Sequence, residues 1–137
     1  MCANVIGYIK LPLLLLGKVV CPRHFRSINM ASLPVTYMNQ QNAWVDTTIF
    51  SLWFHNHFVH SVQKQLQEMK LPKKALLILD NCSAHPDEEL LVSKDKLVKA
   101  MFLPPNVTSL IQPMDQGVLE CLKRHYKRSL LCYLMKQ

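Results

Sequence analysis

The segment LLILDNCSAH, residues 76–85, contains the strongest structural signal in the sequence. An aliphatic run leads directly into Asp80 and Asn81, which predicts a buried strand that ends with a carboxylate at its tip. The uninterrupted apolar run over residues 75–79 is typical of a strand that is covered on both faces. Asp80 is therefore either part of a functional site or the first residue of an Asx-type turn.

Strands and helices are predicted to alternate on both sides of this segment. The first elements expected are two short strands within residues 3–20, joined near Gly7, of which the second includes the run at 11–16. An irregular connection at 21–42 and a helix from about Asp46 to before Pro72 follow. After the strand at 75–79 we expect a short acidic helix from Pro86 to about Val92, a strand at 98–103 and a helix at about 115–135. This order predicts an α/β domain with a parallel portion. We expect residues 1–137 to form a single domain, as the length allows.

The composition favours an intracellular protein with a polyanionic partner. Lys and Arg number 16 against 9 Asp and Glu, giving a net charge of +7, which suits nucleic acid or an acidic membrane surface. The 5 cysteines form no CxxC pair, so a disulfide framework or a zinc ribbon is not indicated. The apolar run at residues 11–16 is much shorter than the roughly 20 residues of a membrane helix, so no membrane partner is expected.

The last predicted helix separates apolar and basic residues onto different faces. Its apolar residues recur every four positions and predict a stripe that packs on the core: Val118, Leu122, Tyr126, Leu130 and Leu134. Its basic residues cluster away from that stripe: Lys123, Arg124, Lys127 and Arg128. This basic cluster is either a solvated helix face or a surface that contacts the phosphates of a nucleic acid.

A second carboxylate, Asp115, stands in the sequence QPMDQG at the start of the last helix. A helix, a strand and a loop separate it from Asp80, which is enough chain to bring both to one edge of a sheet. Mg²⁺ prefers carboxylate oxygens, and two ions about 3.5 to 4 Å apart can hold the attacking and leaving oxygens of a phosphodiester. The structural alternative for Asp115 is a helix cap.

Longer motifs reveal a family resemblance. The motifs are AWVDTTIFSLWF, LLILDNCSAHP, EELLVSKD, MFLPPNVTSLIQPMDQGV and LKRHYKR. Together they resemble the DDE endonuclease domain of pogo and Tigger-type DNA transposases and of their domesticated relatives, the jerky-like and centromere protein B-like proteins. The resemblance covers nearly the whole chain.

The resemblance implies a fold, a chemistry and a set of site residues. The fold is RNase H-like, and the activity is metal-dependent DNA cleavage and strand transfer by three acidic residues. By motif, Asp80 matches the second acidic residue and Asp115 the third, so both are the expected ligands of Mg²⁺. Asn81, His85 and Gln112 are expected near that site. DNA is the expected partner, and the nucleus is the expected location.

The chain departs from the family pattern at its N-terminus. The first acidic residue of the family lies on a strand upstream of the motif that begins at Cys2, and no residue of this sequence matches it. We therefore expect an N-terminally truncated, incomplete RNase H-like fold, a mixed sheet flanked by helices that lacks its first, central strand. Because one of the three acidic residues has no match, we expect the chain alone to bind Mg²⁺ weakly and not to cleave DNA. As a hypothesis, unpaired strand edges lead to self-association.

Three functions remain open from the sequence. The leading hypothesis is a transposon-derived DDE domain that binds DNA and is not an active enzyme. The second is an active Mg²⁺-dependent nuclease, if a longer isoform or a partner chain supplies the first aspartate. The third is a protein-interaction scaffold that retains the old catalytic surface without using it.

Overall fold

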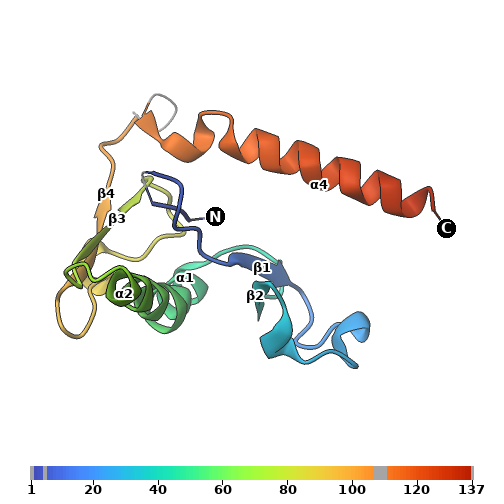
Figure 1. The fold of residues 1–137 in the computed structure, drawn as a ribbon, viewed down its shortest axis with the longest axis horizontal. Helices are drawn as coiled ribbons and strands as arrows, with labels where there is room; N and C mark the ends of the chain where they lie inside the picture. The colour runs from blue at the N-terminus through green and yellow to red at the C-terminus, as the bar shows by residue number, and fades with distance from the viewer. Residues whose placement is uncertain (1, 5, 107–110, 137) are drawn as a thin grey trace. The chain divides into compact units, whose positions relative to one another are not determined.

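The computed structural model describes residues 2–4, 6–106 and 111–136, and it shows a mixed α/β protein (Figure 1). The chain divides into two compact units. The first unit comprises Met1–Ile78 and Cys82–Met101, and the second comprises Leu79–Asn81 and Phe102–Gln137. The predicted mixture of strands and helices is confirmed. Within the described ranges, no helix is long and apolar enough to cross a membrane.

Strands β1 (Leu13–Gly17) and β2 (Val35–Asn39) form a parallel two-stranded sheet. Leu15 of β1 lies opposite Tyr37 of β2. The strand predicted at residues 11–16 is confirmed with a shift of its start, but β2 contradicts the irregular connection predicted at 21–42. The sequence VTYMN contains β-branched and aromatic residues that suit a strand. It is short, however, and its pairing with β1 is a contact that the local pattern does not reveal.

A helical segment follows, made of α1 (Thr47–Trp53), a π-helical turn η3 (Phe54–Phe58) and α2 (Val59–Glu68). Asp46 caps its start, because the side-chain Oδ1 accepts a hydrogen bond of 2.8 Å from the backbone N–H of Ile49. The predicted helix is therefore confirmed, with a cap at Asp46. Phe50, Phe54 and Phe58 recur at i, i+4 spacing and are buried, so this face of the helix forms the core of the first unit.

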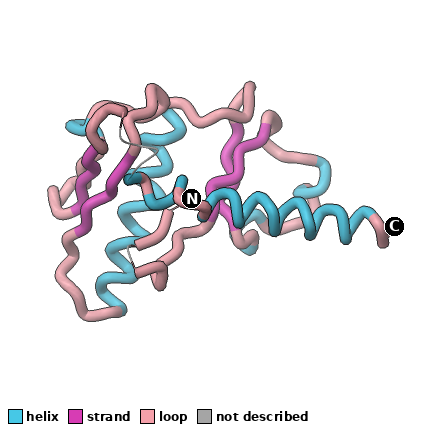
Figure 2. The backbone as a smooth tube through the Cα atoms, turned by 90° about the horizontal axis from the view of Figure 1, so that it is seen from above, coloured by secondary structure: helices cyan, strands magenta, loops and turns pink. Residues whose placement is uncertain are grey.

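Strands β3 (Ala75–Leu79) and β4 (Val98–Phe102) form the second two-stranded sheet, and both pairs are drawn in magenta in Figure 2. Backbone hydrogen bonds run from Ala75 N–H to the Leu97 carbonyl and from Leu103 N–H to the Leu79 carbonyl, so the two strands advance in the same direction. One face is covered, since Leu77, Val98 and Ala100 are buried. The other face carries Leu76, Ile78 and Met101, which are 55%, 50% and 41% exposed.

The exposed face of β3 contradicts the prediction that this strand is covered on both sides. The apolar run ALLIL has the composition of a fully buried strand, but burial depends on which elements pack against each face. The outer edge of β4 is protected by the chain before it. Ser93 N–H donates to the Val98 carbonyl, and Ala100 N–H donates to the Leu91 carbonyl. The strand predicted at residues 98–103 is confirmed.

Two predicted helices differ from expectation. The acidic helix after Pro86 is reduced to one 3-10 turn, η4 (Glu88–Leu90). The last helix, α4 (Val118–Leu134), begins after Gly117, not at Asp115. Gly117 adopts φ 82°, a left-handed conformation that glycine accepts without the penalty of a side chain, and this turn separates α4 from the preceding chain.

Candidate carboxylate site and nucleic-acid interface

Asp80 and Asn81 directly follow the last residue of β3. The 2.7 Å hydrogen bond from Leu103 N–H to the Leu79 carbonyl holds this strand end beside the chain that leaves β4. Asp80 is half-buried and Asn81 is exposed. Asp80 therefore lies at the carboxyl end of a parallel strand pair, the edge at which open α/β sheets bind their ligands.

Asp115 is the last residue of the 3-10 turn η5 (Pro113–Asp115), which precedes α4. Its N–H donates to the Gln112 carbonyl at 3.1 Å, and its own carbonyl accepts a 2.9 Å hydrogen bond from Gly117 N–H. The residue is exposed, so its carboxylate is open to solvent. The Oε1 atom of Gln112 is buried and has no hydrogen-bond partner within the described part of the chain.

The second unit contains most of the residues that the sequence singled out. Leu79–Asn81 groups with Phe102–Gln137, so Asp80 and Asn81 share one compact unit with Gln112, Asp115 and the basic residues of α4. His85 belongs to the first unit, where its ring packs edge-on against Phe50. Residues 107–110 of the motif LPPNVTSLIQPMDQG lie outside the described residues.

The donor chemistry of these residues suits Mg²⁺ in kind, because carboxylate and amide oxygens are hard ligands. The number of such ligands is lower than the family resemblance implies. Across residues 2–4, 6–106 and 111–136, no three His, Cys, Asp or Glu side chains come together in a way that could hold a metal ion. Asp80 and Asp115 alone do not make the three-carboxylate set that the family resemblance implies.

The basic residues of α4 all lie exposed on one continuous helix: Lys123, Arg124, Lys127 and Arg128. At 3.6 residues per turn they occupy an arc of roughly 140°. Arg124 Nη2 forms a 2.6 Å ion pair with Glu120 Oε1 one turn earlier, and both side chains are largely exposed. The arrangement presents several positive charges to solvent with one carboxylate among them.

The apolar stripe of α4 does not pack on a core, which contradicts the prediction from its spacing. Val118, Leu122, Tyr126, Leu130 and Leu134 are between 36% and 66% exposed, and none of the 17 residues of α4 is buried. In the second unit α4 contacts the turn η5. Four-residue spacing predicts that apolar side chains share a face, but it does not predict what covers that face.

Three lysines that the sequence did not predict as site residues line one surface hollow. Lys74, Lys96 and Lys99 line an open hollow of about 470 Å³ at the start of β3 and β4. The signal available in the sequence was weak, because Lys99 interrupts an apolar strand and Lys74 and Lys96 lie in turns. Only the pairing of β3 with β4 brings the three positions to one place.

Comparison with known proteins gives a consistent family assignment. Residues 1–137 match the family described as DDE superfamily endonuclease. The human jerky protein homolog is 47% identical over 128 residues, which cover 92% of this chain and 22% of that protein. The human Tigger transposable element-derived protein 7 is 40% identical over 131 residues, which cover 93% of this chain and 24% of that protein.

The mouse jerky protein is 46% identical over 126 residues, or 90% of this chain and 22% of the mouse protein. The chain therefore spans less than a quarter of the length of these relatives. No solved structure gives a significant match.

Proposed function

Because the chain belongs to the DDE superfamily endonuclease family, related to the jerky and Tigger-derived proteins, we propose that its 137 residues bind DNA in the nucleus without cleaving it unaided. The observation that carries the binding proposal is the row of exposed basic residues on α4. Lys123, Arg124, Lys127 and Arg128 face solvent on one helix of a chain with a net charge of +7. Such a surface contacts phosphates and displaces their counterions without reading base edges.

The absence of unaided cleavage follows from the carboxylates. Asp80 and Asp115 match the second and third acidic residues of the family, and no residue of this sequence matches the first. Their membership in one compact unit supports a shared site, and the lack of a third donor in the described residues argues for weak Mg²⁺ binding. Asn81 and Gln112, which belong to the same unit, are proposed as neighbours of that site.

We propose an RNase H-like arrangement as the architecture to which these elements belong. The parallel pairing of β3 with β4 and the position of Asp80 after β3 support it. In the described part of the chain, the exposed Leu76 and Ile78 leave one face of β3 uncovered. Self-association through this strand is therefore part of the proposal.

The test of DNA binding is fluorescence anisotropy with a duplex oligonucleotide at several salt concentrations. Wild-type protein is expected to bind with a logarithmic salt slope of several units, since each phosphate contact contributes about 0.9. A variant with Lys123, Arg124, Lys127 and Arg128 changed to Gln is expected to lose about 3 to 4 units of that slope. Unchanged binding by this variant contradicts the proposed surface.

The test of catalysis is a nicking assay on supercoiled DNA with Mg²⁺ or Mn²⁺. No nicking above background is expected for the wild-type chain or for Asp80→Asn. Nicking by wild type that disappears in Asp80→Asn and Asp115→Asn overturns the proposal in favour of an active nuclease. DNA binding that is absent at low salt, with folding intact, favours a protein-interaction scaffold.

A further inference from the structure

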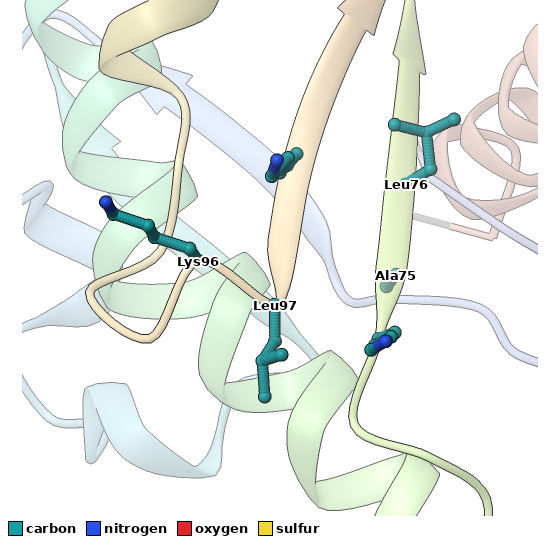
Figure 3. Close-up of a pocket in the computed structure, with 6 residues that line it drawn as sticks. Ala75, Leu76, Lys96 and Leu97 are labelled. Atoms are coloured by element: carbon teal, nitrogen blue, oxygen red, sulfur yellow. The ribbon is translucent and has the colours of Figure 1, made fainter.

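The open hollow lined by Lys74, Lys96 and Lys99 lies on the first unit. It measures about 470 Å³ and is lined by Lys74, Ala75, Leu76, Lys96, Leu97 and Lys99. Figure 3 shows Leu76 on β3, and Lys96 reaching outward from the turn that precedes β4. The lining contains three cationic side chains, three apolar ones and no acidic one.

The strand pairing explains why these lysines line the same hollow. The hydrogen bond from Ala75 N–H to the Leu97 carbonyl sets the beginnings of β3 and β4 side by side. Exposed and buried residues alternate along both strands, so Leu76 and Lys99 belong to the uncovered face, while Leu77, Val98 and Ala100 point to the core. Apolar walls between like charges raise the local positive potential, because the field is screened less there than in open water.

One carboxylate is adjacent to the rim of this hollow in the sequence. Asp95 precedes Lys96, and its side chain is hydrogen-bonded inside the turn. It accepts hydrogen bonds from the Ser93 hydroxyl, from the Leu97 N–H at 3.1 Å and from the Gln63 amide nitrogen at 2.8 Å. In the described part of the chain, the ion pairs formed by lysines or arginines join other residues, Lys64 to Glu68 and Arg124 to Glu120.

Lys96 also adopts a backbone conformation that does not favour lysine. Its φ is 59°, in the left-handed region, and its N–H donates to the Ser93 carbonyl at 2.9 Å. A residue other than glycine costs about 1 to 2 kcal/mol in this region. The backbone alone would be better served by glycine or asparagine, so the turn holds a long cationic side chain at the rim despite this penalty.

We propose that Lys74, Lys96 and Lys99 form a second phosphate-binding site, which contacts the backbone of a nucleic acid. The proposal rests on the proposed DNA binding, since it assigns further phosphate contacts to the same ligand. Lysine suits this role, because its ammonium group is a compact charge on a flexible stem and can follow a phosphodiester backbone without reading its bases. A site of this kind adds affinity and salt dependence without sequence specificity.

The experiment measures duplex binding by anisotropy as a function of salt for three variants of the full 137-residue chain. The pocket variant carries Lys74→Gln, Lys96→Gln and Lys99→Gln. The control variant carries Lys10→Gln, Lys18→Gln and Lys94→Gln, which are equally exposed positions and lower the net charge by the same amount. The third variant neutralises the four basic residues of α4. Circular dichroism checks that each variant is folded.

The pocket variant is expected to lose about 2 to 3 units of salt slope relative to the control variant, since three phosphate contacts are removed at about 0.9 each. On the wild-type chain, bound duplex is expected to protect Lys74, Lys96 and Lys99 from acetylation, read by mass spectrometry. Equal slopes for pocket and control variants, with no protection, overturn the inference while binding through α4 stands. If neither the pocket variant nor the α4 variant loses salt slope, the proposed function is contradicted as well. Binding confined to phosphatidylserine vesicles, with none to duplex, also overturns it.

Discussion

The ring of His85 packs edge-on against the ring of Phe50, with centroids 4.3 Å apart and planes at 67°. Phe50 is buried on α1, and His85 closes a turn in which its N–H donates to the Cys82 carbonyl. The histidine of the motif DNCSAH therefore connects the loop that follows Asp80 and Asn81 to the core of the first unit. This contact gives His85 a structural role within the loop.

A double-mutant cycle tests this aromatic contact. His85→Ala and Phe50→Leu are each expected to lower the free energy of unfolding, and the two changes should couple by about 0.5 to 1.5 kcal/mol, as edge-to-face pairs do. Urea unfolding of wild type, both single variants and the double variant measures the coupling. His57→Ala is the control, because His57 is exposed and its change should stay within about 0.5 kcal/mol. Additive effects at His85 and Phe50 contradict the contact.

The turn around Asp95 predicts a pH dependence of stability. Hydrogen bonds, first of all from the Ser93 hydroxyl and next from the Leu97 N–H, lower the pKa of the exposed Asp95 carboxyl. A carboxyl whose pKa is lower in the folded than in the unfolded state stabilises the fold above its unfolded pKa, about 3.9. That contribution is lost as the pH falls through the lower folded pKa.

Urea unfolding of wild type and Asp95→Asn at about pH 7, 5, 4 and 3 measures this effect. The advantage of wild type over Asp95→Asn should be constant from about pH 7 to 5 and should shrink at the two lower values. Asp87→Asn serves as the comparison for removing one negative charge from a basic chain. An advantage that grows as the pH falls has the wrong sign and contradicts the assignment.

Gly17 of β1 lies against the ring of Tyr37, and this close approach requires glycine. A Cβ atom at position 17 would lie 2.9 and 3.0 Å from two ring atoms of Tyr37 and closer still to its hydroxyl oxygen. The ring is held by a hydrogen bond from its hydroxyl to the Val19 carbonyl and by an edge contact with Phe25. Gly17→Ala is expected to destabilise the chain by about 1 to 3 kcal/mol, as overpacking does.

The background of Tyr37→Ala separates the clash from other effects of the alanine. Without the ring, Gly17→Ala should become neutral or stabilise by up to about 1 kcal/mol, because alanine reduces the conformational freedom of the unfolded chain. Thermal unfolding of the four combinations gives both values. A penalty that persists without the ring shows that Tyr37 is not its cause.

Local signals in the sequence predicted the elements whose ends are fixed by nearby residues. Asp46, Thr47 and Thr48 were all possible caps of the helix, and the structure selects Asp46. The apolar run at residues 75–79 is β3, with Asp80 directly after it. The carboxylate at the strand tip was predicted from the segment LLILDNCSAH, and the family resemblance from five longer motifs together. The residues that surround Asp80 in space could not be predicted, because the grouping of Leu79–Asn81 with Phe102–Gln137 depends on contacts between distant segments.

The features that could not be predicted from the sequence depend on tertiary packing. β2 forms by pairing with β1, the uncovered face of β3 reflects what does not pack on it, and Lys74, Lys96 and Lys99 converge only through the alignment of two strands. The start of α4 shifted from Asp115 to Val118 because Gly117 takes a left-handed conformation there. Spacing rules report which side chains share a face, and tertiary contacts decide whether that face is buried.

The exposed stripe of α4 gives the sharpest test of this distinction. Leu130→Gln is expected to change the free energy of unfolding by less than about 0.5 kcal/mol, because Leu130 is 42% exposed. Phe54→Ala is the matched change in the core, where the side chain is 0% exposed, and it should cost about 3 to 5 kcal/mol.

Hydrogen exchange on the wild-type chain provides the second measurement. No residue of α4 is buried, so tertiary packing protects this helix little, and its amides should exchange faster than those of β4. DNA binding through Lys123 and its neighbours should slow exchange in α4, whereas vesicles of neutral lipid should not. A cost of 2 kcal/mol or more for Leu130→Gln, with slow exchange throughout α4, would mean that the stripe is buried in solution.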